Sequence, residues 1–235
     1  MDDKEAVILE IERSLWRKGH SFIAGVDEAG RGPLAGPVVA AAVILPEKIS
    51  PFITKDSKKL SKKKREELFY QILSKAVSVG VGFADVEEID ELNIYRATLL
   101  AAKRAISELS PAPDFLITDY IKIPEFADRI LPLVKGDEKS ISCACASVVA
   151  KVVRDYIMDS LCPLFPEYGF SSHKGYPTKR HFEALKKYGI TALHRRSFAG
   201  LSSLGERGRG TGLLLSKEER LRYYREKLEE LFGRD

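Results

Sequence analysis

The chain has 235 residues, 44% of them hydrophobic, and a net charge of +4, so it can bury a large core and is predicted to form one main domain. Its charged first residues and the lack of a long apolar run exclude a signal peptide and a membrane-spanning helix. Cys143, Cys145 and Cys162 are too few and too irregularly spaced for a disulfide scaffold or a zinc pair, which favours a soluble protein of the reducing cytoplasm.

Apolar residues at helical spacing predict a short N-terminal helix over residues 6–16, ahead of the first strand. That strand begins at Ile23, and the apolar run Pro37–Leu45 is expected to pair with it as in a hairpin. We expect the main domain to cover residues 1–200, and residues 201–235 to form a Gly/Arg-rich linker followed by a C-terminal helix.

The first strand runs into two adjacent carboxylates, Asp27 and Glu28, and then breaks at the loop Gly30-Arg31-Gly32. Two neighbouring carboxylates repel each other and resist burial, whereas a divalent cation between them turns that repulsion into ligation. Side chains alternate along a strand, so both acids reach one ion only if the chain bends at Glu28. The alternative is a polar surface turn.

Residues 55–65 form the densest basic segment of the chain, and Ser61 is expected to cap a helix that ends near Lys75. Lysines in the first turn oppose the helix dipole, so a phosphate partner explains them as well as a solvated face does. Within this segment, Lys58 is the candidate phosphate-binding residue.

The rest of the chain predicts further strands and helices, with a carboxylate again at the end of a strand. The strands are expected at residues 77–84, 115–119 and 130–134, and the helices at 93–109, 142–158 and 179–188. Asp119 ends its strand as Asp27 ends the first, which favours a shared role over that of a turn residue. Asp137 precedes the long helix, where N-capping and metal ligation remain alternatives.

The loop over residues 173–178 carries one aromatic residue, Tyr176, among basic neighbours. An exposed tyrosine there can stack on a sugar or a base, and packing beside Pro177 is the alternative. His181 and His194 have no partner at metal-ligand spacing, so we expect both to be hydrogen-bonded structural residues.

Two further segments contain arginine. Arg154-Asp155 is predicted to form a supporting or surface ion pair without a catalytic role, and His194-Arg195-Arg196 is predicted to add positive charge. The spacing of Gly30-Arg31-Gly32 does not match a dinucleotide fingerprint, and the chain has no phosphate-loop, HExxH or GxSxG motif. Nucleotide-cofactor and serine-hydrolase functions therefore lose support.

Seven motifs, in the order in which they occur, resemble those of the ribonuclease HII family and cover about residues 22 to 200. They are Gly25-Val26-Asp27-Glu28-Ala29-Gly30-Arg31-Gly32, Asp56-Ser57-Lys58-Lys59-Leu60-Ser61, Asp119 at a strand end, Lys135-Gly136-Asp137, Ala146-Ser147-Val148-Val149-Ala150-Lys151-Val152, His173-Lys174-Gly175-Tyr176 and His194-Arg195-Arg196-Ser197-Phe198. The sister type, ribonuclease HIII, usually has a threonine where Arg31 stands, so the resemblance is to type HII.

The resemblance implies a ribonuclease H-like α/β fold, with a central mixed β-sheet flanked by helices and a small C-terminal helical region. It implies an endonuclease that cleaves the RNA strand of RNA/DNA hybrids and nicks duplex DNA 5′ to embedded ribonucleotides, leaving 3′-OH and 5′-phosphate ends. It also implies a monomer whose partners are these duplexes. A noncatalytic duplex-binding protein, or another nuclease or a transposase of the same fold, remains the alternative.

By position, Asp27, Glu28, Asp119 and Asp137 resemble the family's four metal-binding carboxylates. Four such acids suit two hard divalent ions, Mg²⁺ or Mn²⁺, and two-metal hydrolysis needs no side-chain nucleophile. Tyr120 departs from the family pattern, because the residue after the third acid is commonly glycine, and this leaves the local loop geometry open.

The resemblance also assigns the residues that would recognise the substrate. Gly30, Arg31 and Gly32 resemble the family's reader of the ribose 2′-hydroxyl, the group that distinguishes RNA from DNA. Tyr176 is similar to the tyrosine that stacks on the deoxyribose after the junction, and Lys58 to a lysine near the phosphates.

Overall fold

The structure is a computed structural model that describes residues 3–50, 52–53, 60–198, 200–201 and 216–233, with side chains from residue 9 onward. Lys58 and the predicted linker around residues 205–212 lie outside the described residues. The chain forms two compact units. The first comprises Met1–Ala29, Val39–Gly82 and Leu99–Val152, and the second comprises Gly30–Val38, Phe83–Thr98 and Val153–Asp235.

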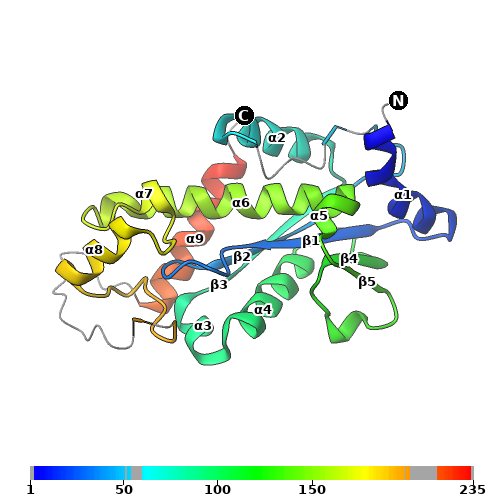
Figure 1. Cartoon of the computed structure of the whole chain (residues 1–235). Coiled ribbons are helices and arrows are strands. Elements are labelled where there is room, and N and C mark those ends of the chain that lie inside the picture. Colours follow the sequence, from blue (N-terminus) through cyan, green and yellow to red (C-terminus); the bar gives the residue numbers. More distant parts are fainter. Residues whose placement is uncertain (1–2, 51, 54–59, 199, 202–215, 234–235) are drawn as a thin grey trace. The chain divides into compact units, whose positions relative to one another are not determined.

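A five-stranded mixed sheet is the framework of the fold (Figure 1). Its strands are β1 (Ile23–Ala29), β2 (Val38–Ile44), β3 (Ser78–Ala84), β4 (Phe115–Asp119) and β5 (Ile130–Leu133), in the order β3-β2-β1-β4-β5. β1 pairs antiparallel with β2 and parallel with β4, and β4 pairs parallel with β5. The predicted mixed sheet, including the hairpin-like pairing of β1 with β2, is confirmed.

Within the first unit, helices flank this sheet as predicted (Figure 1). The helices of the two units are α1 (Asp3–Arg17), α2 (Lys62–Lys75), α3 (Val86–Leu92), α4 (Ile94–Ser107), α5 (Gly136–Lys139), α6 (Ile141–Leu161), α7 (Phe170–His173), α8 (Lys179–Tyr188) and α9 (Lys217–Phe232), with short 3₁₀ turns at Pro124–Phe126 and Cys162–Leu164. The Ser61 side chain accepts a hydrogen bond from the Lys64 amide and so caps α2, as expected. No described helix is both long and apolar enough to cross a bilayer.

The core of the first unit forms where α6 packs against β1. Leu15, Ile23, Ile117 and Cys143 are buried together there. Gly25 permits the close approach, because a Cβ atom at this position would lie 2.1 Å from the carbonyl carbon of Ser142. The small residues of α6 therefore pack closely on the sheet, as the sequence predicts.

In the second unit, α9 is fixed by a buried ion pair rather than by leucines alone. Arg220 is 1% exposed, and its Nη2 atom lies 2.8 Å from Asp85 Oδ2 and 2.7 Å from Glu87 Oε1. Tyr224 is also buried and donates a hydrogen bond to Asp85. The charged pattern of this helix does not reveal that Arg220 is buried, because the carboxylate that compensates its charge, Asp85, lies 135 residues earlier in the chain.

Candidate active site

Asp27 and Glu28 both lie within β1, which continues to Ala29. The register pairs Asp27 with Ala41 and Glu28 with Ala40 of β2, so the expected bend at Glu28 is not formed. The backbone first enters the left-handed region at Gly30, where φ is +98°. Side chains alternate along a regular strand, but Glu28 directly follows Asp27 and its negative charge acts on the Asp27 carboxyl.

Asp119 ends β4, the parallel neighbour of β1. Val26 is in register with Thr118, so Asp27 and Asp119 come next to each other at the same edge of the sheet. One Asp119 carboxylate oxygen accepts a hydrogen bond of 3.0 Å from the amide of Gly136. Asp27 and Asp119, which the sequence predicts at the ends of two strands, are thus neighbours in the folded chain.

Asp27 is 4% exposed, and its surroundings oppose its ionisation. Burial raises the pKa of this carboxyl well above its ordinary value, and the negative charges of Glu28 and Asp119 raise it further. A hydrogen bond from the Ser147 side chain and another from the Glu28 amide, at 2.7 Å, partly offset this effect. A cation placed among these groups would reverse the balance, because it favours every ionised carboxylate.

Asp137 lies inside the short helix α5 and is 1% exposed. Lys135 precedes it in a left-handed conformation, and the next residue, Gly136, is bound to Asp119. The alternative that Asp137 caps the long helix is wrong, because α6 begins only at Ile141. The chain therefore brings Asp137 back to the end of β4 by way of β5 and this turn.

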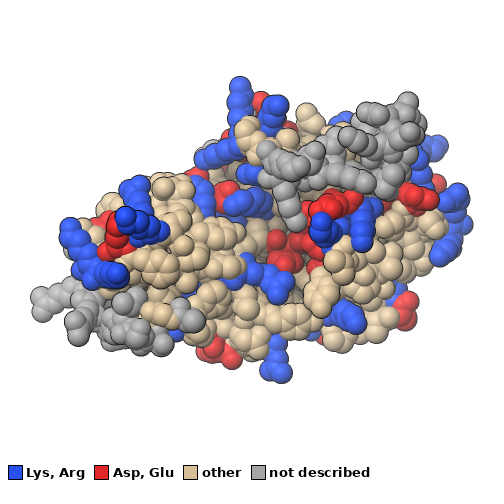
Figure 2. All heavy atoms as spheres, viewed as in Figure 1, with Lys and Arg blue, Asp and Glu red and all other residues tan. Residues whose placement is uncertain are grey.

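Among the described residues, no group of three or more His, Cys, Asp or Glu side chains is arranged so as to hold a metal ion. The donor chemistry nevertheless fits a hard divalent cation, since all four candidate ligands are carboxylates, and burial together with the charges of Glu28 and Asp119 raises the pKa of Asp27. Figure 2 shows a group of acidic side chains set among Lys and Arg on the face in view.

The candidate substrate-recognition residues belong to the second unit. Gly30 is buried, whereas Arg31 and Gly32 are exposed. Tyr176 is 39% exposed, and a Cβ atom at Gly32 would lie 3.8 Å from its ring. The loop Gly30-Arg31-Gly32 and Tyr176 therefore lie side by side although about 144 residues separate them.

Two buried arginines lie against this loop. Arg154 and Arg195 are both 0% exposed and donate hydrogen bonds to backbone carbonyls. The positive charge that the sequence predicts at Arg195 is thus enclosed within the second unit. The burial of Arg154 could have been predicted from the sequence, since it lies four residues from Ala150 and from Met158, which are on the buried face of α6.

Three histidines of the second unit form a compact cluster next to Tyr176. The rings of His173 and His181 stack with centroids 4.5 Å apart, and His181 contacts His194 through a 3.1 Å hydrogen bond between their Nε2 atoms. The expectation that His181 and His194 are hydrogen-bonded structural residues is confirmed. His181 Nδ1 also bonds the Tyr176 carbonyl, so the cluster supports that loop.

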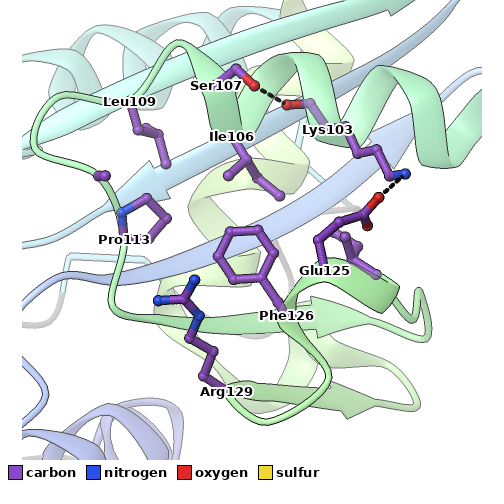
Figure 3. A pocket seen from close by; sticks show the side chains of 10 residues that line it. Lys103, Ile106, Ser107, Leu109, Pro113, Glu125, Phe126 and Arg129 are labelled. Atoms are coloured by element: carbon purple, nitrogen blue, oxygen red, sulfur yellow. Dashed lines mark hydrogen bonds and ion pairs between the residues drawn. The ribbon is translucent and has the colours of Figure 1, made fainter.

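A cavity of about 430 Å³ lies elsewhere in the first unit, between α4 and the turn at Pro124–Phe126 (Figure 3). Its apolar wall includes Ile106 and Phe126, and a Lys103–Glu125 ion pair borders it. None of the candidate site residues lines this cavity.

The segment that contains the candidate site residues also matches known proteins. Residues 24–201 match the family described as Ribonuclease HII. A Ribonuclease HII of Aquifex aeolicus (strain VF5) is 54% identical over 194 residues, which cover 83% of this chain and 97% of that protein.

Two solved structures are also similar to this chain. The crystal structure of the ribonuclease H2 from Pyrococcus horikoshii OT3 matches with a TM-score of 0.68 and 28% identity, over 79% of this chain and 97% of that one. The structure of the PCNA:RNase HII complex from Archaeoglobus fulgidus matches with a TM-score of 0.62 and 30% identity, over 74% and 93% respectively.

Proposed function

The chain belongs to the ribonuclease HII family of metal-dependent endonucleases, which cleave the RNA strand of RNA/DNA hybrids, and we propose that it also nicks duplex DNA 5′ to embedded ribonucleotides. In this reaction the oxygen of a water molecule bonds to the phosphorus and the water loses a proton, while the bond from phosphorus to the 3′ oxygen breaks and that oxygen takes up a proton. The products carry a 3′-OH and a 5′-phosphate. The observation that carries the proposal is the burial of Asp27 beside the charges of Glu28 and Asp119.

We propose that Asp27, Glu28, Asp119 and Asp137 hold two divalent ions, Mg²⁺ or Mn²⁺. When bound, such ions activate the attacking water and neutralise charge on the leaving oxygen. The carboxylates supply hard oxygen ligands, and Asp119 is held in place by the amide of Gly136. No side-chain nucleophile is required, because water is the attacking group.

Gly30, Arg31 and Gly32 are proposed to recognise the ribose 2′-hydroxyl, with Tyr176 stacking on the adjacent deoxyribose. The exposure of Arg31, Gly32 and Tyr176 and the closeness of the loop to the ring support these roles. Lys58 is proposed to bind a phosphate, on the basis of its motif alone.

We further propose that the enzyme acts as a monomer in the cytoplasm, where its duplex substrates occur. The three free cysteines are consistent with a reducing compartment. A noncatalytic duplex-binding protein of the same fold is the second candidate, but it gives no reason to retain repelling carboxylates at a sheet edge.

A labelled DNA duplex with one embedded ribonucleotide tests the proposal. Incubation with Mg²⁺ or Mn²⁺ is expected to produce a single nick 5′ to the ribonucleotide, with 3′-OH and 5′-phosphate ends, and EDTA is expected to abolish it. An all-DNA duplex of the same sequence is the control. Tight binding of the duplex without cleavage in either cation would instead support the noncatalytic protein.

A further inference from the structure

The guanidinium of Arg195 lies under the loop that follows β1 and binds its carbonyls. Its Nη2 atom donates to the carbonyl of Gly30 at 2.7 Å, and Nη1 donates to that of Arg31 at 3.1 Å. Nε and Nη2 both donate to the carbonyl of Gly36, at 3.0 and 2.8 Å. One planar side chain thus fixes both ends of the loop.

Arg154 holds the following residues in the same way and connects them to the second recognition element. Its Nη2 and Nε atoms donate to the carbonyls of Ala35 and Pro37, at 3.1 and 3.0 Å. Its Nη1 atom donates to the carbonyl of Lys174 at 3.0 Å, and its guanidinium lies 5.8 Å from the ring of Tyr176. Arg154 therefore ties the loop after β1 to the segment that carries Tyr176.

The enclosed charges of Arg154 and Arg195 oppose the stability that their hydrogen bonds supply. In the described part of the chain, the hydrogen bonds of both guanidiniums go to backbone carbonyls rather than to carboxylates. Burial lowers the pKa of Arg154 and of Arg195, and the positive charge of Arg154 lowers the pKa of Arg195 further. Two enclosed like charges cost stability, and such a cost is typical of functional sites.

The direction of the bound carbonyls determines where the loop amides point. In a trans peptide the carbonyl and the following N–H lie on opposite sides. When the carbonyls of Gly30 and Arg31 face the guanidinium, the N–H groups of Arg31 and Gly32 face away from it. Gly32 is exposed and has no side chain, so its N–H lies where an approaching hydroxyl can accept from it, and the Arg31 N–H points to the same side of the loop.

Gly30 is required for this contact. Its φ of +98° lies in the left-handed region, and a Cβ atom would come 2.1 Å from Arg154 Nε. A side chain at this position would displace the guanidinium from the loop.

We infer that Arg154 and Arg195 are positioning residues for 2′-hydroxyl recognition, because they hold the carbonyls of the loop inward and its amides outward, beside Tyr176. The inference rests on the proposed function, since it assigns the same loop its means of reading ribose. It predicts that these arginines affect the distinction between ribose and deoxyribose more than they affect general duplex binding.

The test measures kcat and KM for the single-ribonucleotide duplex and the inhibition constant Ki of the matched all-DNA duplex as a competitor. The ratio of Ki to KM reports discrimination by the 2′-hydroxyl. Arg195→Lys and Arg154→Lys keep the charge but lose the planar set of donors, so the ratio is expected to fall about tenfold, the order of effect of a misplaced recognition group. Ki itself is expected to stay near its wild-type value.

Arg220→Lys is the matched control, because Arg220 is equally buried in the same unit but pairs with Asp85. It is expected to lower the melting temperature and to leave the ratio unchanged. If both loop variants melt below the assay temperature, Gly36→Ala replaces them. It keeps both guanidiniums but shifts the loop, because Gly36 has a φ of +83° that strains alanine, and the added Cβ would lie 2.4 Å from the flexible Met158 side chain and 3.5 Å from Arg154 Nη2. This variant is expected to lower the ratio by a smaller factor.

A folded Arg195→Lys or Arg154→Lys variant with the wild-type ratio would overturn the inference and leave the proposed function intact. Where the replacement is needed, an unchanged ratio in Gly36→Ala has the same meaning. A wild-type enzyme that binds both duplexes equally, or does not cleave at the ribonucleotide, would instead contradict the proposed function.

Discussion

His181 and His194 share a 3.1 Å hydrogen bond between their Nε2 atoms, and their other contacts define which of the two Nε2 atoms carries the shared proton. His194 Nδ1 accepts from the Thr191 amide, so its proton is on Nε2 and is donated to His181. His181 in turn donates from Nδ1 to the carbonyl of Tyr176. The bond therefore requires both imidazoles to be neutral, since protonated His181 would point a second N–H at His194.

Acid is accordingly expected to destabilise the fold through this pair. Burial lowers the pKa of His181 to about 4 and that of His194 to about 3, whereas both titrate near 6.5 in the unfolded chain. Between these values the unfolded state binds more protons, so the free energy of unfolding decreases as the pH falls below 6.5, by up to about 1.4 kcal/mol per pH unit per histidine. Urea denaturation between pH 7 and 4 measures this slope.

His181→Gln isolates the contribution of His181 to the pH dependence of the free energy of unfolding, because glutamine does not titrate. The stability difference between wild type and variant is expected to shrink as the pH falls. The raised pKa of Asp27 acts in the opposite direction, but it does so in both proteins and cancels in the difference. Parallel pH profiles would show that His181 is not held neutral.

Replacing Asp119 by asparagine is expected to abolish turnover without unfolding the protein. The side-chain carbonyl oxygen of the introduced asparagine can still accept from the Gly136 amide, whereas the loss of charge weakens a metal ligand. Cleavage of the single-ribonucleotide duplex in Mg²⁺ is expected to fall about a thousandfold, since bound ions supply several kcal/mol to the transition state. Thermal melting in EDTA is expected to be unchanged or higher, because one charge that opposes ionised Asp27 is removed.

Asp128→Asn is the control for that substitution, since it removes an exposed acid of the same unit. It is expected to retain wild-type cleavage. Full activity of Asp119→Asn in Mg²⁺ would contradict the proposed metal role of Asp119.

Tyr176→Ala is expected to weaken cleavage at an embedded ribonucleotide by removing a stacking surface. Stacking of an aromatic side chain contributes about 1–3 kcal/mol, so kcat/KM is expected to fall by roughly 5- to 150-fold. Tyr176→Phe keeps the ring and is expected to stay close to wild type. If alanine and phenylalanine give equal rates, the ring has no stacking role.

Tyr120 is expected to be a site where glycine stabilises the fold. Its φ is +63° and its side chain is 66% exposed, so the residue has backbone strain with little burial to offset it. Tyr120→Gly is expected to raise the free energy of unfolding by up to about 1 kcal/mol, because the relief of strain exceeds the entropic cost of glycine. Tyr120→Ala keeps a Cβ atom, and an equal gain in that variant would rule out backbone strain as the cause.

Local sequence signals determined most of the elements. Alternating or apolar runs predicted the strands, and helical spacing with caps such as Ser61 predicted the helices, because these effects act between residues a few positions apart. The four acids, the loop Gly30-Arg31-Gly32 and Tyr176 were also predicted as site residues from the sequence, by the order of their motifs, and these roles stay predictions. The sequence did not predict which of these side chains and backbone groups contact one another.

Only the tertiary structure decided which groups meet. Arg195 bonds Gly36 across 159 positions of the chain, and Arg220 bonds Asp85 across 135, so no periodicity could separate these buried guanidiniums from solvated ones. The continuation of β1 through Glu28 likewise depends on pairing with β2, which overrides the bend that local glycines permit. Local preference sets the elements, whereas burial and long-range hydrogen bonds set the chemistry of each polar group.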